Sequence, residues 1–247
     1  MSLLQVCFDV ESSGVDVKND RILTCFAQVQ DGDEILETRE WIIDPGIEIP
    51  EEASAIHGMT TEWIREHGRK DARQAIEEIY SFLFNWSLAG HVITGFNHSF
   101  DLAMLHHEVI RNHPGAKRIS LDHAQFVDPL VLDRAIDKYR KGKRTLEAVA
   151  QHYGVPFNPD EAHAADYDVK VTAQLVPKVL NVAWKKLPGL RGDSPEKFIQ
   201  NIQQFQADAK QEWASHLMEY FAKAGKTEED GSPVIVSGAF PYEGVAS

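Results

Sequence analysis

The segment LLQVCFDVESSG, residues 3–14, is more informative about the fold than any other part of the chain. Its first eight residues are mostly apolar and include β-branched and aromatic side chains, which is typical of a buried strand. Asp9 and Glu11 stand two residues apart near its end, so their side chains point to the same face. Open α/β sheets bind ligands beyond the carboxyl ends of their strands. The stretch therefore predicts a strand that presents two carboxylates to a site, where Gly14 allows a sharp turn.

A third carboxylate, Asp101, follows a second apolar run, residues 91–96. Residues 99–111 show the periodicity of an amphipathic helix, which places Asp101 in its first turn. If the two strands are neighbours in a sheet, Asp101 faces Asp9 and Glu11 across a small gap. Carboxylates are hard oxygen ligands, so this group favours magnesium or manganese over zinc.

The pair His163 and Asp168 supplies a further carboxylate and a group that can move protons. Five positions separate the two residues, which would place them on different faces of one helix. We therefore expect His163 in a loop and Asp168 in the helix that follows. A histidine beside a metal site can accept a proton from water. Asp166 is close enough in sequence to be an alternative to Asp168.

Together the ordered patterns Asp-x-Glu, Asn-x-x-Phe-Asp and His-x-x-x-x-Asp resemble the three exonuclease motifs of the DEDD superfamily, in its histidine branch (DEDDh). The resemblance covers about residues 3–180 and includes AIHGMT at 55–60 and GKRTL at 142–146. Within this superfamily, the motif pattern is similar to that of the DnaQ-like epsilon proofreading subunit of bacterial DNA polymerase III and to that of stand-alone bacterial and phage exonucleases. The tyrosine branch has its tyrosine four residues before the last aspartate, where this chain has Ala164.

The resemblance implies two-metal hydrolysis of phosphodiester bonds, with release of nucleoside monophosphates from a 3′ end. The two divalent ions, Mg²⁺ or Mn²⁺, would be held by four carboxylates, those of Asp9, Glu11, Asp101 and Asp168. Glu11 would also orient the attacking water or the terminal 3′-hydroxyl, and His163 would be the general base.

Eight further residues are candidates for holding the substrate: Ser12, Ser13, Gly14, His57, Asn97, Phe100, Lys143 and Arg144. The first three offer hydroxyl and backbone donors, and His57 and Phe100 offer flat surfaces for stacking. Turn formation, loop capping and core packing are their alternative roles, and core packing is favoured for Phe100. For Asn97, a structural hydrogen bond competes with a substrate contact.

The formal net charge of −13 is unusual for an enzyme of nucleic acids. Local cations and bound metals decide contact with phosphate, whereas whole-chain charge governs long-range steering. Five lysines and arginines fall within residues 138–144, either as a solvated loop or as a phosphate contact. The resemblance favours a substrate role for Lys143 and Arg144. An acidic surface elsewhere predicts weak, salt-sensitive binding to duplexes and a preference for single-stranded ends.

Composition predicts the compartment. Cys7 and Cys25 both fall in apolar segments, so we expect no disulfide framework and a reducing cytoplasm. The amino terminus lacks the pattern of a secretory signal, and no apolar run approaches the length of a membrane span. The prediction is a cytoplasmic protein without membrane contact, whose oligomeric state stays open.

The expected architecture is an α/β fold, a ribonuclease H-like mixed five-stranded sheet flanked by helices. Strands are expected at 3–10, 22–30, 34–43, 91–96 and near 126, and helices at 71–86, 99–111, 129–139, 145–153 and 167–182. We expect an exonuclease domain at 1–181, a helical extension at 182–225 and a Gly- and acid-rich tail at 226–247. The aromatic stripe of residues 194–224 either packs on the core, which we favour, or binds a partner. The tail is either loose or docked.

Three function classes remain open from the sequence. The leading prediction is a 3′-to-5′ exonuclease acting on single-stranded DNA ends. An RNA-trimming exoribonuclease is the first alternative, because no residue here decides recognition of the 2′-hydroxyl. The second alternative is a subunit of a polymerase or repair complex that acts mainly through binding.

Overall fold

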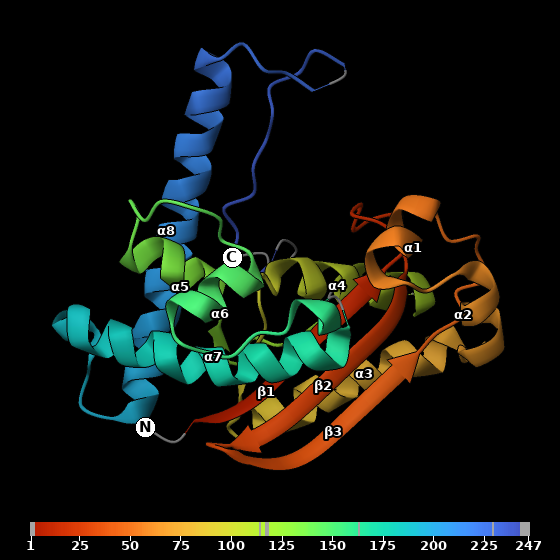
Figure 1. The fold of residues 1–247 in the computed structure, drawn as a ribbon, viewed down its shortest axis with the longest axis horizontal. Helices are drawn as coiled ribbons and strands as arrows, with labels where there is room; N and C mark the ends of the chain where they lie inside the picture. Colours follow the sequence, from red (N-terminus) through yellow and green to blue (C-terminus); the bar gives the residue numbers. More distant parts are fainter. Residues whose placement is uncertain (1–2, 114, 117–118, 163, 229, 243–247) are drawn as a thin grey trace.

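The computed structural model describes residues 3–113, 115–116, 119–162, 164–228 and 230–242 (Figure 1). Its centre is a five-stranded sheet of order β3-β2-β1-β4-β5. The strands are β1 (Leu4–Ser12), β2 (Ile22–Asp31), β3 (Glu34–Ile42), β4 (Val92–Thr94) and β5 (Phe126–Val127). β1 pairs antiparallel with β2 and parallel with β4. The predicted mixed five-stranded sheet is confirmed, and its central strand is the one that carries Asp9 and Glu11.

Helices cover both faces of this sheet (Figure 1). They are α1 (Glu51–His57), α2 (Thr61–His67), α3 (Ala72–Leu88), α4 (Ser99–Asn112), α5 (Pro129–Ile136), α6 (Leu146–His152), α7 (Ala165–Lys186) and α8 (Pro195–Lys223). The sequence did not indicate α1 and α2, because helices of one or two turns show little periodicity and depend on tertiary contacts. Thr60 caps α2 by accepting a hydrogen bond from the Trp63 amide at 3.2 Å.

One predicted strand and one predicted helix were too long. The strand expected at 91–96 ends at Thr94, because the chain turns at Gly95. A Cβ at Gly95 would lie 2.9 Å from the Phe8 carbonyl oxygen, so only glycine allows β1 and this turn to approach so closely. The helix expected at 129–139 ends at Ile136.

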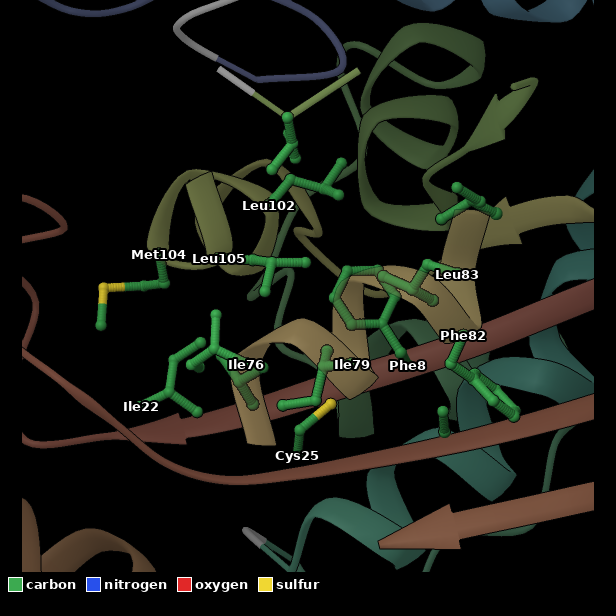
Figure 2. Packing of buried hydrophobic residues seen from close by; sticks show 14 of the residues in the cluster. Phe8, Ile22, Cys25, Ile76, Ile79, Phe82, Leu83, Leu102, Met104 and Leu105 are labelled. Atoms are coloured by element: carbon green, nitrogen blue, oxygen red, sulfur yellow. The ribbon is translucent and has the colours of Figure 1, made fainter. Parts of the chain in front are cut away.

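β1 separates two apolar cores. Its even-numbered residues Val6, Phe8 and Val10 pack with α3 and α4 in the cluster drawn in Figure 2. The opposite face is covered by α5, α6, α7 and α8, whose buried side chains form a second cluster. The alternation follows from the two-residue period of a strand. It leaves the odd-numbered residues of β1, including Asp9 and Glu11, on the side of α7.

The first half of α8 packs on the second core. Phe198, Ile199 and Ile202 are buried, which confirms the packing interpretation for this part of the aromatic stripe. Past Ala214 the side chains of α8 are largely exposed, and the helix projects beyond the rest of the fold (Figure 1). Ala224 and Gly225 end it, with Gly225 at φ 65°.

The tail returns from the end of α8 and docks, without forming a strand in residues 234–236. The Phe240 ring lies 5.5 Å from that of His98. Tyr242 is buried, and its hydroxyl donates a hydrogen bond to the Ile119 carbonyl at 3.4 Å. The division of the chain at 181 and 225 stays a prediction, and residue 181 itself lies within α7.

Among the described residues, no helix combines the length and the apolar character needed to cross a bilayer. Cys7 and Cys25 are both buried free thiols. Burial raises the pKa of each thiol above its usual value. Their role as small apolar core residues therefore agrees with the sequence prediction.

We expect Phe198→Ala to lower the free energy of unfolding by about 3–5 kcal/mol, because it leaves a cavity beside Trp184 in the second core. Tyr220→Ala is the matched control, since Tyr220 lies on the same helix and is 60% exposed; its effect should stay within about 0.5 kcal/mol. Urea denaturation measures both values. Equal losses for the two variants would contradict the packing of the first half of α8.

Candidate active site

Two buried hydrogen bonds fix helix α7 on strand β1. The Gln5 side-chain amide donates to the Ala173 carbonyl at 2.9 Å, and the Cys7 thiol donates to the Val169 carbonyl at 3.6 Å. Two residues of strand rise by about 6.6 Å and four residues of helix by about 6 Å, so the two elements stay in step as they run in opposite directions. This register continues to Asp9 at the level of the first turn of α7.

Asp168 stands in that first turn and therefore close to the carboxylates of β1. Burial is the main cause of the raised pKa of Asp9 and of Glu11, and the charge of Asp168 raises both further, so the three groups lie within electrostatic reach of one another. Asp166, the alternative considered from sequence, instead pairs with Lys170 at 2.6 Å at a half-exposed position. The structure therefore brings Asp168 to the group, as predicted.

Asp101 reaches the carboxylate group from α4, the helix that follows β4. Its Oδ1 accepts a hydrogen bond from the Val10 amide at 3.2 Å. The chain turns at Gly95, close to the Phe8 carbonyl of β1, and Asn97 has a left-handed conformation with φ 63°. These two features bring the start of α4 next to β1. The parallel pairing of β1 with β4 thus places Asp101 against Asp9 and Glu11, as the sequence predicted.

The four carboxylates are costly to ionise together. Asp101 is 4% exposed, and burial raises its pKa to about 8. Burial, followed by the charge of Asp168, raises the pKa of Glu11 to about 7. Burial and the charges of Asp101, Glu11 and Asp168 raise the pKa of Asp9 well above its usual value. Like charges in a low-dielectric site repel, so this arrangement calls for a cation.

The donor set fits divalent metal ions of the hard class. All four groups supply carboxylate oxygens, the ligands that Mg²⁺ and Mn²⁺ prefer. In the described part of the chain, no three His, Cys, Asp or Glu side chains are already gathered into a coordination cage. The fit therefore rests on oxygen ligands, burial and excess negative charge. Asp9, Glu11, Asp101 and Asp168 are the residues that would hold the ions.

The predicted general base, His163, lies outside the described residues. Its neighbour Ala164 is the N-cap of α7, and Asp168 follows four residues later. The expectation that the helix begins after His163 agrees with the start of α7 at Ala165. The role of His163 stays a prediction.

The turn after β1 uses most of its polar groups internally. The Ser13 hydroxyl donates to Asp20 at 2.8 Å and accepts from the Arg21 amide at 3.0 Å. The Ser12 hydroxyl donates to the Gly14 carbonyl at 2.7 Å, and a Cβ at Gly14 would collide with Asp20. The predicted substrate contacts of these three residues remain open, beside a turn-forming role that the structure accounts for.

His57 lies at the same end of β1. Burial lowers its pKa, and a backbone contact with Ser12 opposes this shift. Its Nδ1 accepts a hydrogen bond from the Met59 amide at 3.2 Å. The ring is therefore held against the Ser12 backbone at the end of β1. Its stacking role stays a prediction. Phe100, by contrast, is half-buried against the first core.

The backbone and the side chain of Asn97 have separate surroundings. Its amide donates to Asp128 Oδ1 at 3.2 Å, and its carbonyl accepts from the Phe100 amide at 3.0 Å. Its side chain is exposed on the wall of a cavity between α5 and α8. A structural hydrogen bond through the backbone of Asn97 and a substrate contact through its side chain are thus compatible.

Of the predicted basic contacts, Lys143 is exposed and Arg144 is held by the protein. The Arg144 guanidinium pairs with buried Asp133 at 2.5 Å and donates to the Asp133 and Asp137 carbonyls. These contacts account for Arg144 as a structural residue. A phosphate contact of Lys143 stays a prediction.

The residues that position the Asn97 turn were not predicted from the sequence. Asp128 is fully buried, caps α5 by accepting from the Leu130 amide at 2.9 Å, and accepts from the Asn97 amide. The Asp128 amide in turn donates to Gln206 on α8 at 2.7 Å. An aspartate followed by proline is a typical helix start, but only the fold shows that this cap also holds the second motif.

The fold and the gathered carboxylates can be compared with known proteins. The family model of the RNase T exonucleases matches residues 6–176, which include all four carboxylates. The chain belongs to this exonuclease family, within the DEDD superfamily. Its DnaQ-like sheet and motif order agree with that assignment, and the resemblance inferred from sequence is confirmed.

Curated relatives of this exonuclease differ in what they are part of. A PolC-type DNA polymerase III of Pediococcus pentosaceus is 26% identical over 69% of the chain, which spans only 11% of that polymerase. A ribonuclease T of Vibrio campbellii is 26% identical over 74% of the chain and 88% of the relative. Among solved structures, E. coli exonuclease I with a dT13 oligonucleotide matches at a TM-score of 0.63 and 20% identity, over 80% of this chain and 45% of that one.

We expect Asp101→Asn to stabilise the metal-free exonuclease at high pH. Because folding raises the pKa of Asp101, its contribution to stability is full at low pH and is lost as the pH rises from about 4 through about 8. The gain should be smallest at about pH 4 and largest at about pH 9, where we expect Tm to rise by at least about 4 °C. Thermal unfolding in EDTA measures it.

Added Mn²⁺ or Mg²⁺ should raise the Tm of the native exonuclease and raise that of Asp101→Asn less, because a ligand stabilises the state that binds it. Asp208→Asn is the control, since Asp208 is exposed on α8. The same pH profile and the same metal response in both variants would contradict a metal site at the buried carboxylates.

Proposed function

We propose that this chain is a metal-dependent 3′-to-5′ exonuclease that removes nucleoside monophosphates from single-stranded DNA ends. The observation that carries the proposal is the convergence of Asp9, Glu11, Asp101 and Asp168 from β1, α4 and α7 on one buried group. Membership of the exonuclease family supplies the class of chemistry. Solved complexes of exonuclease I with dT13 and dA16 support a single-stranded DNA substrate.

In the proposed mechanism the residues divide the work. Bound Mg²⁺ or Mn²⁺ would supply Lewis acidity to water and to the leaving oxygen. Asp9 and Asp168 would hold one ion, and Asp9 and Asp101 the other. Glu11 orients the attacking water or the terminal 3′-hydroxyl. His163 accepts the proton of that water as the phosphodiester bond is attacked.

RNA is the second candidate substrate, and one observation favours it. The ribonuclease T relatives are matched over 88% of their length, whereas the polymerases are matched over 11%. The chemistry at the carboxylates is the same for either sugar, so only a contact with the 2′-hydroxyl would separate them. Digestion of DNA and RNA oligonucleotides of one sequence decides between the two.

A role inside a larger assembly is the third candidate. The PolC-type relatives are polymerases of which this chain would form a small part, and one neighbouring structure is an exonuclease I complex with SSB-Ct. Cleavage by the isolated chain would favour an independent exonuclease. Activity that appears only after addition of a polymerase would favour the assembly.

Digestion of 3′-labelled and 5′-labelled single-stranded oligonucleotides tests the proposal. We expect stepwise shortening from the 3′ end with Mn²⁺ or Mg²⁺ and none with EDTA. Asp9→Ala should reduce the rate by about 100- to 1,000-fold, because several kcal/mol of transition-state stabilisation are lost. His163→Ala should reduce kcat by about 100- to 10,000-fold while the metal-induced rise in Tm persists. Full activity of His163→Ala across neutral pH would contradict its role.

Lys143→Ala should weaken substrate binding and reduce the slope of log affinity against log salt by about 0.7, the value for one phosphate contact on a single strand. Lys141→Ala is a suitable control, because both lysines are exposed in the same loop. Fluorescence anisotropy with a labelled oligonucleotide in EDTA measures both slopes. Identical slopes for the two variants would assign Lys143 to the solvated loop.

A further inference from the structure

A cavity of about 510 Å³ opens between α5 and α8, and its wall reverses the charge of the molecule. Five cations line it against one carboxylate: Arg134, Lys138, Arg140, Arg144 and Lys210, with Glu212. The chain as a whole carries −13. A local cationic wall on an acidic protein is where a polyanion would bind. The α8 side of this wall lies outside the segment 6–176 that the exonuclease family shares.

Aromatic rings stand among these cations. Tyr139 is 92% exposed and Trp213 is 39% exposed, both on the lining of the cavity. The Arg134 guanidinium lies 5.0 Å from the centre of the Trp213 ring. Exposed rings beside arginine and lysine are the combination that binds single-stranded nucleic acid, because bases stack on the rings while cations contact phosphates.

The cations are fixed before any ligand arrives. Buried Asp133 holds Arg140 at 2.6 Å and Arg144 at 2.5 Å. Lys138 pairs with Glu212 at 2.7 Å and so joins α5 to α8 at the cavity. Side chains that are already ordered lose less entropy on binding. The wall is therefore a built surface and not a set of freely moving side chains.

The cavity reaches the start of α4, the helix that carries Asp101. Asn97, which lies four residues before Asp101, forms part of its wall. Lys210 of α8 also lines it and donates a hydrogen bond to Ser99 at the start of α4. A single DNA strand whose 3′ end lies at the four carboxylates would pass Asn97 before it reached α5 and α8.

We propose that the cavity between α5 and α8 binds the single-stranded DNA that lies 5′ of the terminal nucleotide. Arg134, Lys138 and Lys210 contact its phosphates, and Tyr139 and Trp213 stack on its bases. This assignment rests on the proposed exonuclease function and extends it. It gives the C-terminal helix, which the family match does not include, a role in holding longer substrates.

The kinetic test compares a long substrate with a minimal one. The long substrate is dT12, and the minimal one is the p-nitrophenyl ester of thymidine 5′-monophosphate, which reaches only the carboxylates. For Tyr139→Ala and for Trp213→Ala we expect the KM for dT12 to rise about 5- to 100-fold, with kcat and the minimal substrate unchanged. Tyr220→Ala, on the exposed part of α8, is the control and should change neither.

A binding test separates this site from the chemistry. Anisotropy of labelled dT12 in EDTA should show the same loss of affinity for Tyr139→Ala and Trp213→Ala. Lys138→Gln should also reduce the salt slope by about 0.7, whereas Lys223→Gln, at the far end of α8, should not. Failure of the native protein to cleave either substrate would refute the exonuclease proposal, and the binding data alone would then decide the cavity.

Two results would overturn the assignment of the cavity. In the first, neither Tyr139→Ala nor Trp213→Ala changes the KM for dT12 relative to the KM for the minimal substrate, and neither changes the affinity for dT12. The second is competition by polyglutamate as effective as competition by unlabelled dT12 of equal charge. That result would show a general polyanion surface in which the rings have no part.

Discussion

The register of α7 on β1 is the constraint on which the candidate site depends. Gln5 ties three elements together, because its amide donates to Ala173 of α7 and its carbonyl oxygen accepts from Thr94 of β4 at 2.9 Å. A shift of β1 by one residue would move every side chain to the opposite face and send its carboxylates into the first core. Buried polar contacts of this kind fix one arrangement where apolar packing alone would tolerate several.

The same arrangement concentrates negative charge where it is least stable. Asp9, Glu11 and Asp101 all have raised pKa values because they are buried beside like charges. Sites of this kind store instability that a bound cation relieves, so metal binding and stability are linked. The apolar packing of the two cores on either side of β1 offsets the free-energy cost of burying this group of carboxylates.

The C-terminal region serves both the core and the surface around the site. The first half of α8 fills the second core, and Gln206 in its middle supports Asp128 and therefore the Asn97 turn. The tail then covers His98 with Phe240. Burial lowers the pKa of His98 to about 3, so its ring stays neutral beside Asp128. Helix α8 and the tail thus support the motif of residues 97–101, and α8 also forms one wall of the cavity.

The sequence was enough to predict the strand with Asp9 and Glu11, the helix start with Asp101, and the family, because strand alternation and motif order are local properties. It also favoured packing for the helix of residues 194–224. It did not reveal α1 and α2, the early end of β4, the support from Asp128, or the cavity that joins Tyr139 to Trp213. These features depend on residues far apart in the chain that only close packing brings together, and one-dimensional patterns carry no record of such contacts.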